Sequence, residues 1–151
     1  MTHAWTIAER EYQRHEARRG RRHAFERLEP ATTALVVIDM VPFFAADNPH
    51  CRDAIEPINR LADALRRAGG VVAWVLPAAE DRHPELSCEF YGATVAEAYG
   101  RSGGAGALPD RLCPQLTHAP GDLFVEKSSP SAWVSCGHSR SGRAPAPPDR
   151  P

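Results

Sequence analysis

The stretch Ala34-Leu35-Val36-Val37-Ile38-Asp39-Met40-Val41-Pro42-Phe43-Phe44 decides the fold of this chain. It begins with five apolar residues, rich in β-branched types, that lead directly into an aspartate. Such an uninterrupted run is typical of a strand buried on both faces, in a parallel sheet covered by helices. Ligands bind at the carboxyl ends of the strands in these sheets, and Asp39 stands at that end. Because an unpaired buried carboxylate is costly, Asp39 either caps the next turn or takes part in chemistry.

Two further apolar runs follow the first along the chain. Residues 71–76 form one run, which ends at Pro77, and residues 122–127 form the other, with Lys127 at its carboxyl end. Between the first two strands, residues 52–68 place apolar side chains at i, i+3 and i+4, which predicts an amphipathic helix. Its apolar positions are Ile58, Leu61, Ala62, Leu65 and Ala68. The sequence therefore predicts an α/β fold with a parallel sheet and a right-handed crossover.

The flanking segments have a different character. Residues 1–29 read as an N-terminal extension rich in Arg and Glu that forms a helix broken near Gly20. Its basic cluster, Arg18 to Arg22, is offset by nearby glutamates, which favours a solvated, ion-paired face over a nucleic-acid site. Residues 77–108 are irregular apart from a short helix near 93–100. Connections of that length are often lids or binding loops.

Composition narrows the classes of function. The formal net charge of −1 and the pI of about 6.6 argue against a field that attracts nucleic acid or an anionic membrane. No apolar run reaches the ~18 residues of a membrane span, and the first residues lack the features of a signal peptide. The four cysteines show no metal-binding spacing. We therefore expect a cytoplasmic protein with no cofactor, no nucleic-acid partner and no membrane partner.

Asp39 and Lys127 end different strands, so the two side chains can face each other at one edge of the sheet. A neighbouring ammonium group favours the ionised carboxylate, and such a pair suits general acid–base chemistry. A purely structural ion pair is the alternative, and spacing alone favours that alternative.

Three motifs carry a resemblance to a known family. Leu35–Met40, with Phe43 and Phe44 close behind, resembles the first strand of the isochorismatase-like cysteine hydrolases. Val125–Trp133 resembles the lysine motif of that family, and Leu61–Gly70 resembles its first crossover helix. The resemblance covers residues 30–133, in the order in which the family has these motifs.

The resemblance implies a three-layer, Rossmann-like fold and a Cys-Asp-Lys triad that attacks an amide-type C–N bond of a small molecule. Asp39 then corresponds to the aspartate and Lys127 to the lysine, while Phe43, Phe44 and Trp133 become candidate substrate contacts. We also expect a homo-oligomer. The sequence after Asp39 departs from the Met-Gln of many members, which leaves the substrate subclass open. Residues 47–50 do not match the Asp-x-His of zinc-dependent members, so we expect no metal.

The nucleophile is the main departure from the family. There it follows a strand beyond the lysine motif, whereas here Cys136 comes only nine residues after Lys127, in an unrelated context. Cys51, Cys88 and Cys113 do not stand at motif positions either. The sequence thus predicts a sheet that is incomplete at its C-terminus, followed by a disordered tail at 134–151 rich in Pro, Arg and Ser. A shifted reading frame after codon 133 is one hypothesis, and a short paralogue is the other.

Three functions remain open. The first is hydrolysis of an amide-type C–N bond, impaired by the missing nucleophile. The second is hydrolysis of a vinyl ether such as isochorismate, for which Asp39 serves as general acid and no cysteine is needed. The third is a non-catalytic remnant or interaction module that uses the N-terminal helix for contacts.

Overall fold

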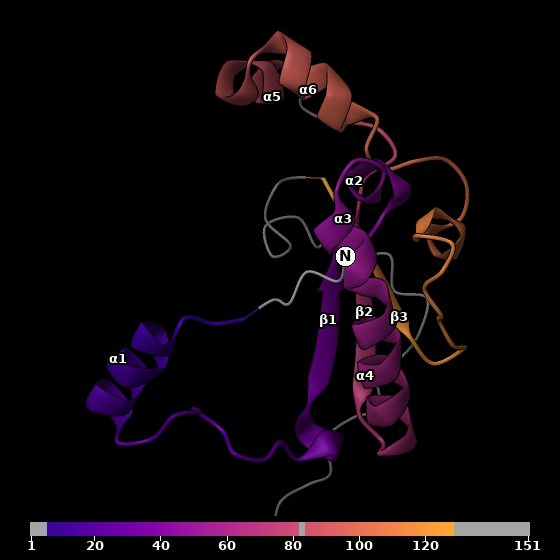
Figure 1. The fold of residues 1–151 in the computed structure, drawn as a ribbon. Coiled ribbons are helices and arrows are strands. Elements are labelled where there is room, and N and C mark those ends of the chain that lie inside the picture. Colours follow the sequence, from indigo (N-terminus) through magenta and orange to yellow (C-terminus); the bar gives the residue numbers. More distant parts are fainter. Residues whose placement is uncertain (1–5, 82–83, 129–151) are drawn as a thin grey trace, which may run out of the picture.

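The computed structural model describes residues 6–81 and 84–128. Three parallel strands form its sheet in the order β1-β2-β3, and they are β1 (Ala34–Ile38), β2 (Val71–Pro77) and β3 (Leu123–Lys127). Figure 1 shows the three strands side by side with one helix running along them. The predicted parallel α/β fold and its three strands are confirmed.

Two helices occupy the segment that was predicted as one. They are α3 (Pro49–Asp53) and α4 (Ile55–Arg67), which meet at Ala54. The side chain of Asn48 caps α3 by accepting hydrogen bonds from the backbone N–H groups of His50 and Cys51. The cap starts a helix before the amphipathic pattern begins, which the apolar periodicity alone does not reveal.

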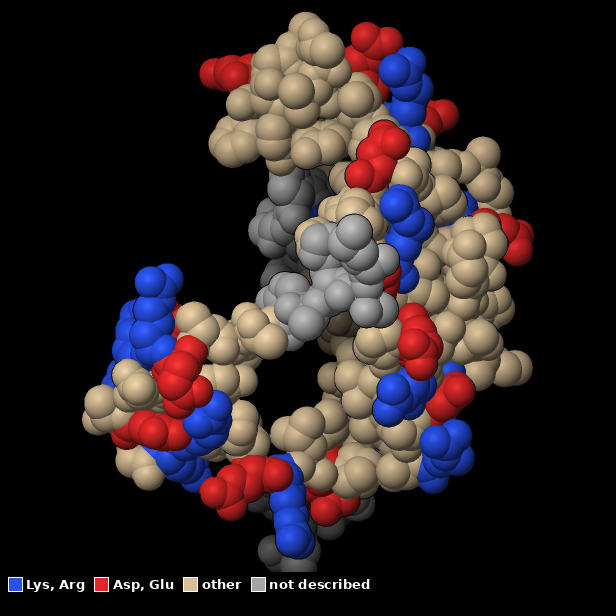
Figure 2. All heavy atoms as spheres, in the orientation of Figure 1, with Lys and Arg blue, Asp and Glu red and all other residues tan. Residues whose placement is uncertain are grey.

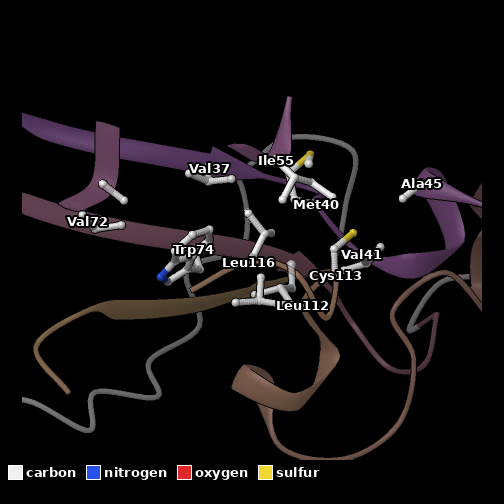
Figure 3. Packing of buried hydrophobic residues seen from close by; sticks show 12 residues of the cluster. Val37, Met40, Val41, Ala45, Ile55, Val72, Trp74, Leu112, Cys113 and Leu116 are labelled. Atoms are coloured by element: carbon white, nitrogen blue, oxygen red, sulfur yellow. The ribbon is translucent and has the colours of Figure 1, made fainter. Parts of the chain in front are cut away.

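The core lies between α4, residues 112–116 and one face of the sheet. Trp74 and Leu76 on β2 and Ala62 on α4 have no solvent exposure. Figure 3 shows Trp74 packed among Leu112, Leu116 and the strands. Leu61, which the helical pattern placed among the core positions, is 54% exposed. The buried stripe of α4 is therefore narrower than its apolar pattern.

The opposite face of the sheet is open along β1, contrary to the sequence-based prediction, although Val75 on that face of β2 is buried with 5% exposure. Val36, Ile38, Val71 and Leu123 are 40–49% exposed. Side chains alternate between the faces of a strand, and α4 and residues 112–116 bury only the face that carries Val37 and Trp74. In the described part of the chain nothing comparable buries Val36 and Ile38, so the prediction that β1 is buried on both faces is wrong.

The N-terminal helix α1 (Glu9–Arg19) ends at Gly20, which adopts the left-handed conformation at φ 70°. Its side chains are not buried, and Arg10 and Arg14 pair with Glu11. Basic and acidic side chains are interspersed over this helix in Figure 2, and Figure 1 shows it standing apart from the sheet. The expected break at Gly20 and the ion-paired, solvated face are therefore both found.

Most of the remaining elements lie near the carboxyl ends of the strands. The 3₁₀ turn η1 (Pro30–Thr32) precedes β1 at its amino end, and α2 (Pro42–Ala45) follows the carboxyl end of β1. The other three are α5 (Pro84–Tyr91), α6 (Ala93–Gly100) and the 3₁₀ turn η2 (Leu108–Arg111). α6 matches the short helix predicted near 93–100, whereas α5 was not predicted. Among the helices described, none has the length and apolar character to span a membrane.

A buried network fastens α4 to the loop before β3. The guanidinium of Arg66 donates to Asp122 at 2.9 and 2.6 Å, and the indole N–H of Trp74 and the amide of Ala119 donate to the same carboxylate at 2.7 and 3.0 Å. Burial raises the pKa of Asp122, but the hydrogen bonds from Arg66, Trp74 and Ala119 outweigh it and hold the pKa below its usual range.

This network predicts an acid-sensitive fold. Because the pKa of Asp122 is lower in the folded chain than in the unfolded chain, its stabilisation is complete above the unfolded pKa of about 3.9 and is lost as pH falls below it. We expect Asp122→Asn to lower the free energy of unfolding by about 1–3 kcal/mol at neutral pH. The deficit should shrink at pH 3. Urea unfolding at both pH values measures it.

The matched control for this experiment is Asp63→Asn. Asp63 also pairs with Arg66, but its side chain is 52% exposed. Exposed pairs contribute little, so this variant should unfold almost like the parent. An Asp122→Asn deficit that stays the same at pH 3 and pH 7 would contradict the network's role.

Candidate active site

Asp39 begins a sharp turn at the carboxyl end of β1. Its N–H donates to the carbonyl of Val75 at 2.9 Å, which continues the ladder to β2, and its own carbonyl accepts from Val41 at 2.9 Å. The residue has φ 60°, and it is the single positive-φ residue other than glycine in the described part of the chain. Aspartate tolerates this left-handed conformation better than most residues. Non-glycine residues in it cluster at functional sites.

Lys127 ends β3, two strands away from Asp39, and is buried with 7% exposure. Its backbone is paired with Pro77 at the end of β2. Its Nζ lies 2.8 Å from Oδ2 of Asp39. The two predicted catalytic side chains, 88 positions apart in the sequence, are therefore brought into direct contact at one edge of the sheet.

The second oxygen of Asp39 differs from the first in its contacts. Oδ1 is buried and has no hydrogen-bond partner among the residues that the structure describes. Buried carboxylate oxygens are nearly always satisfied, so this atom is placed to accept a hydrogen bond from a ligand or from a reacting group. One oxygen of Asp39 thus contacts the lysine, and the other is an acceptor without a partner in the described part of the chain.

A cavity of about 290 Å³ opens over this pair. Beside Asp39 and Lys127 it is lined by Phe44, Pro77, Ala78, Glu80, Asp81, Ser87, Tyr91, Tyr99, Gly100, Ser102 and Ser128. Its volume is near the lower end of the range for small-molecule sites. The walls combine aromatic rings with a few polar groups, as is common in such sites.

The aromatic wall comes from three helices. Phe44 on α2, Tyr91 on α5 and Tyr99 on α6 line the cavity, and the Tyr91 and Tyr99 rings meet edge to face at 5.3 Å. Phe43 lies behind this wall, in contact with the rings of Phe44 and Tyr99. Trp133, the third predicted substrate contact, lies outside the described residues. Sequence reasoning missed Tyr91 and Tyr99, although it predicted that residues 77–108 hold a binding loop.

A family comparison accounts for this arrangement. The model of the isochorismatase domain matches residues 33–138, more than two thirds of the chain. The chain belongs to the isochorismatase family. The match supports descent from hydrolases that act on small molecules, and the parallel sheet agrees with the fold of that family. A comparison with curated proteins gave no match.

In this isochorismatase-family chain no cysteine that the structure describes lines the cavity. Cys113 is 1% exposed and donates its N–H to the carbonyl of Met40. Burial, with a smaller effect of Cys51, raises the pKa of the Cys113 thiol. The thiolate is the reactive form of cysteine, so this group is inert. Cys88 is exposed on α5, and Cys136 lies outside the described residues.

Metal ligands do not gather in the parts of the chain that the structure describes, where no group of three or more His, Cys, Asp or Glu could hold an ion. Residues 47–50, compared above with the zinc-dependent isochorismatase relatives, serve the fold through the Asn48 cap of α3.

The sequence held one further signal for this site. Lys127 is the only lysine of the chain, and all the other residues counted as Lys or Arg are arginines. Arginine suits planar, bidentate contacts, whereas a lysine presents a compact ammonium group. The one position where this isochorismatase-family chain uses an ammonium is the one that contacts Asp39.

Proposed function

We propose that this chain is a hydrolase of small molecules in which Asp39 transfers protons and Lys127 holds it in place. The observation that carries the proposal is the 2.8 Å contact between Lys127 Nζ and Asp39 Oδ2 beneath the cavity, with Oδ1 left unpartnered among the described residues. A carboxyl group with one oxygen held by the lysine and the other left as an acceptor is equipped for general acid–base chemistry.

For an amide-type C–N bond, Oδ1 of Asp39 accepts the proton of the nucleophile while the nucleophile adds to the carbonyl carbon. The same carboxyl group then returns the proton to the leaving nitrogen as the C–N bond breaks. Because the described cysteines do not line the cavity, we propose that amide turnover is impaired unless Cys136 supplies the thiol.

The absence of a thiol from the described cavity lining favours a second candidate, hydrolysis of a vinyl ether. In that reaction a protonated Asp39 gives its proton to the terminal vinyl carbon, and water adds to the ether carbon and passes a proton to the Asp39 carboxylate. As the hemiketal collapses, the ether oxygen takes up this proton and the hydroxyl proton replaces it on Asp39, which gives a ketone and an alcohol and restores the protonated carboxyl group. We further infer a cytoplasmic location, in keeping with the unpaired Cys51, Cys88 and Cys113, and assembly as a homo-oligomer.

Turnover assays with isochorismate and with a panel of small primary amides test the proposal. Vinyl-ether hydrolysis should be lost in Asp39→Asn and should persist in Cys136→Ala. Amide hydrolysis that is lost in Cys136→Ala would assign the nucleophile to Cys136, against the expectation from its sequence context. Activity toward isochorismate that depends on Cys136 would contradict the cysteine-independent route. No turnover of either class by the folded parent would contradict a hydrolase and favour a non-catalytic module.

A further inference from the structure

Arg111 is the one arginine buried in the described part of the chain, with 3% of its side chain exposed. Three of its N–H groups donate to three different segments. Nε donates to the carbonyl of Gly103 at 2.6 Å, Nη1 to Oε2 of Glu126 at 2.7 Å, and Nη2 to the carbonyl of Pro77. This residue was not identified from the sequence.

Two of the three acceptors border Lys127. Glu126 precedes it on β3, and Pro77 is its register partner on β2. The strands stay joined just beyond, where the N–H of Ala78 donates to the carbonyl of Lys127 at 2.7 Å. Arg111 therefore connects the carboxyl ends of β2 and β3, and Lys127 reaches Asp39 from the end of β3.

The third acceptor, the carbonyl of Gly103, lies next to a residue of the cavity wall. A Cβ atom on Gly103 would lie 1.9 Å from the carbonyl oxygen of Ala78, so the backbone at this glycine packs directly on the end of β2. The preceding residue, Ser102, is 5% exposed and lines the cavity. The hydrogen bond from Arg111 to Gly103 thus fixes Ser102 against the strand ends.

Only a guanidinium can make this set of contacts. Its planar fork presents several donors in fixed directions, whereas a lysine offers one compact point charge. The acceptors converge from segments that are up to 34 residues distant in sequence from Arg111, and two of them are backbone carbonyls that need a donor when buried. The arrangement is a rigid joint between β2, β3 and the cavity wall.

We propose that Arg111 is a positioning residue, which holds Lys127 and the Ser102 wall in register with Asp39. Its consequence for turnover rests on the function proposed above. Arg111 does not line the cavity over the Asp39–Lys127 pair, so it acts through Lys127 and not on the substrate. Loss of the joint should therefore lower kcat and leave KM nearly unchanged.

The first test uses the single lysine of the chain. Acetylation with an N-hydroxysuccinimide ester, followed by mass spectrometry, reports the reactivity of Lys127, with the N-terminal amine as internal reference. Burial and the ion pair protect Lys127 in the parent. We expect faster acetylation of Lys127 in Arg111→Met, and an unchanged rate in Arg101→Met. Arg101 is 73% exposed and pairs with Glu97, which makes it the matched control.

The second test measures turnover of the substrate that the parent accepts. We expect kcat of Arg111→Met to fall by roughly 10- to 100-fold, as small misplacements of reacting groups do, with Arg111→Lys failing to restore it. Glu126→Gln removes the charged partner and leaves the carbonyl contacts of Arg111 in place. It gives a smaller change in the same direction and serves if Arg111→Met does not fold.

The outcomes separate the two proposals. A folded Arg111→Met or, failing that, a folded Glu126→Gln with the acetylation rate of the parent overturns the positioning role. An increase in KM with kcat unchanged overturns it as well. If the folded parent turns over no substrate, the proposed hydrolase function fails, and the acetylation rates alone decide the role of Arg111.

Discussion

Asp39→Asn is expected to lower kcat by about 10²- to 10⁴-fold, which is the usual contribution of a positioned acid or base. The amide has the size of the carboxylate, but it neither takes up a proton from a nucleophile nor delivers one to a substrate carbon. It also removes the ion pair with Lys127 Nζ, which lies 2.8 Å from Oδ2 in the parent. KM should change much less, because the aromatic wall remains. Steady-state kinetics on the substrate identified for the parent measures both constants.

Glu80→Gln is the control for the loss of a carboxylate. Glu80 lines the same cavity, is exposed and has no ion pair with Lys127 among the contacts described. It should retain kcat within a few-fold of the parent. An Asp39→Asn variant with kcat close to that of the parent would mean that Asp39 is a structural cap at the end of β1, the alternative that the sequence alone left open.

Trp74→Ala is expected to lower the free energy of unfolding by about 3–5 kcal/mol, the usual cost of removing a buried large aromatic side chain. Trp74 has no exposure, lies in the middle of the central strand and packs among the residues that join the sheet to α4. The variant also loses the 2.7 Å hydrogen bond from the indole to Asp122. Because small domains have total stabilities of about 5–15 kcal/mol, this variant should unfold at much lower urea concentration.

Two further variants separate the contributions to that loss. Trp74→Phe keeps an aromatic ring in the core and removes the N–H donor, so it should cost about 1–3 kcal/mol. Leu61→Ala, at the 54% exposed position of α4, should be nearly neutral. Circular dichroism during urea unfolding measures all three. A Trp74→Ala variant that unfolds within about 1 kcal/mol of the parent would contradict the assignment of Trp74 to the centre of the core.

The strands and the contact between Asp39 and Lys127 were accessible from the sequence for one reason. Apolar runs that end in a charged residue mark both a strand and its carboxyl end, and parallel strands bring those ends to the same edge. The left-handed backbone of Asp39 was not accessible, because its φ follows from the hydrogen bonds to Val75 and Val41. Those bonds form only once the strands have paired.

Other features left no usable pattern. An apolar run reads alike whether one face or both faces of the strand are covered, so the exposure of Val36 and Ile38 could not be foreseen. α5 has neither strong apolar periodicity nor buried residues. Arg111 is recognised through two backbone carbonyls and one carboxylate from distant segments, and no local sequence pattern encodes such acceptors.

The order of the strands has a geometric consequence for the pair formed by Asp39 and Lys127. Asp39 follows β1 and Lys127 ends β3, so the central strand β2 lies between them and sets the distance between their backbones. Two strand spacings of about 4.8 Å each separate their backbones, a gap that needs one long side chain. A shorter cation at position 127 would leave the carboxylate out of reach, whereas Asp39→Glu would push its carboxylate past the ammonium. The distance across β2 thus limits the lengths of the side chains that can make this contact from positions 39 and 127.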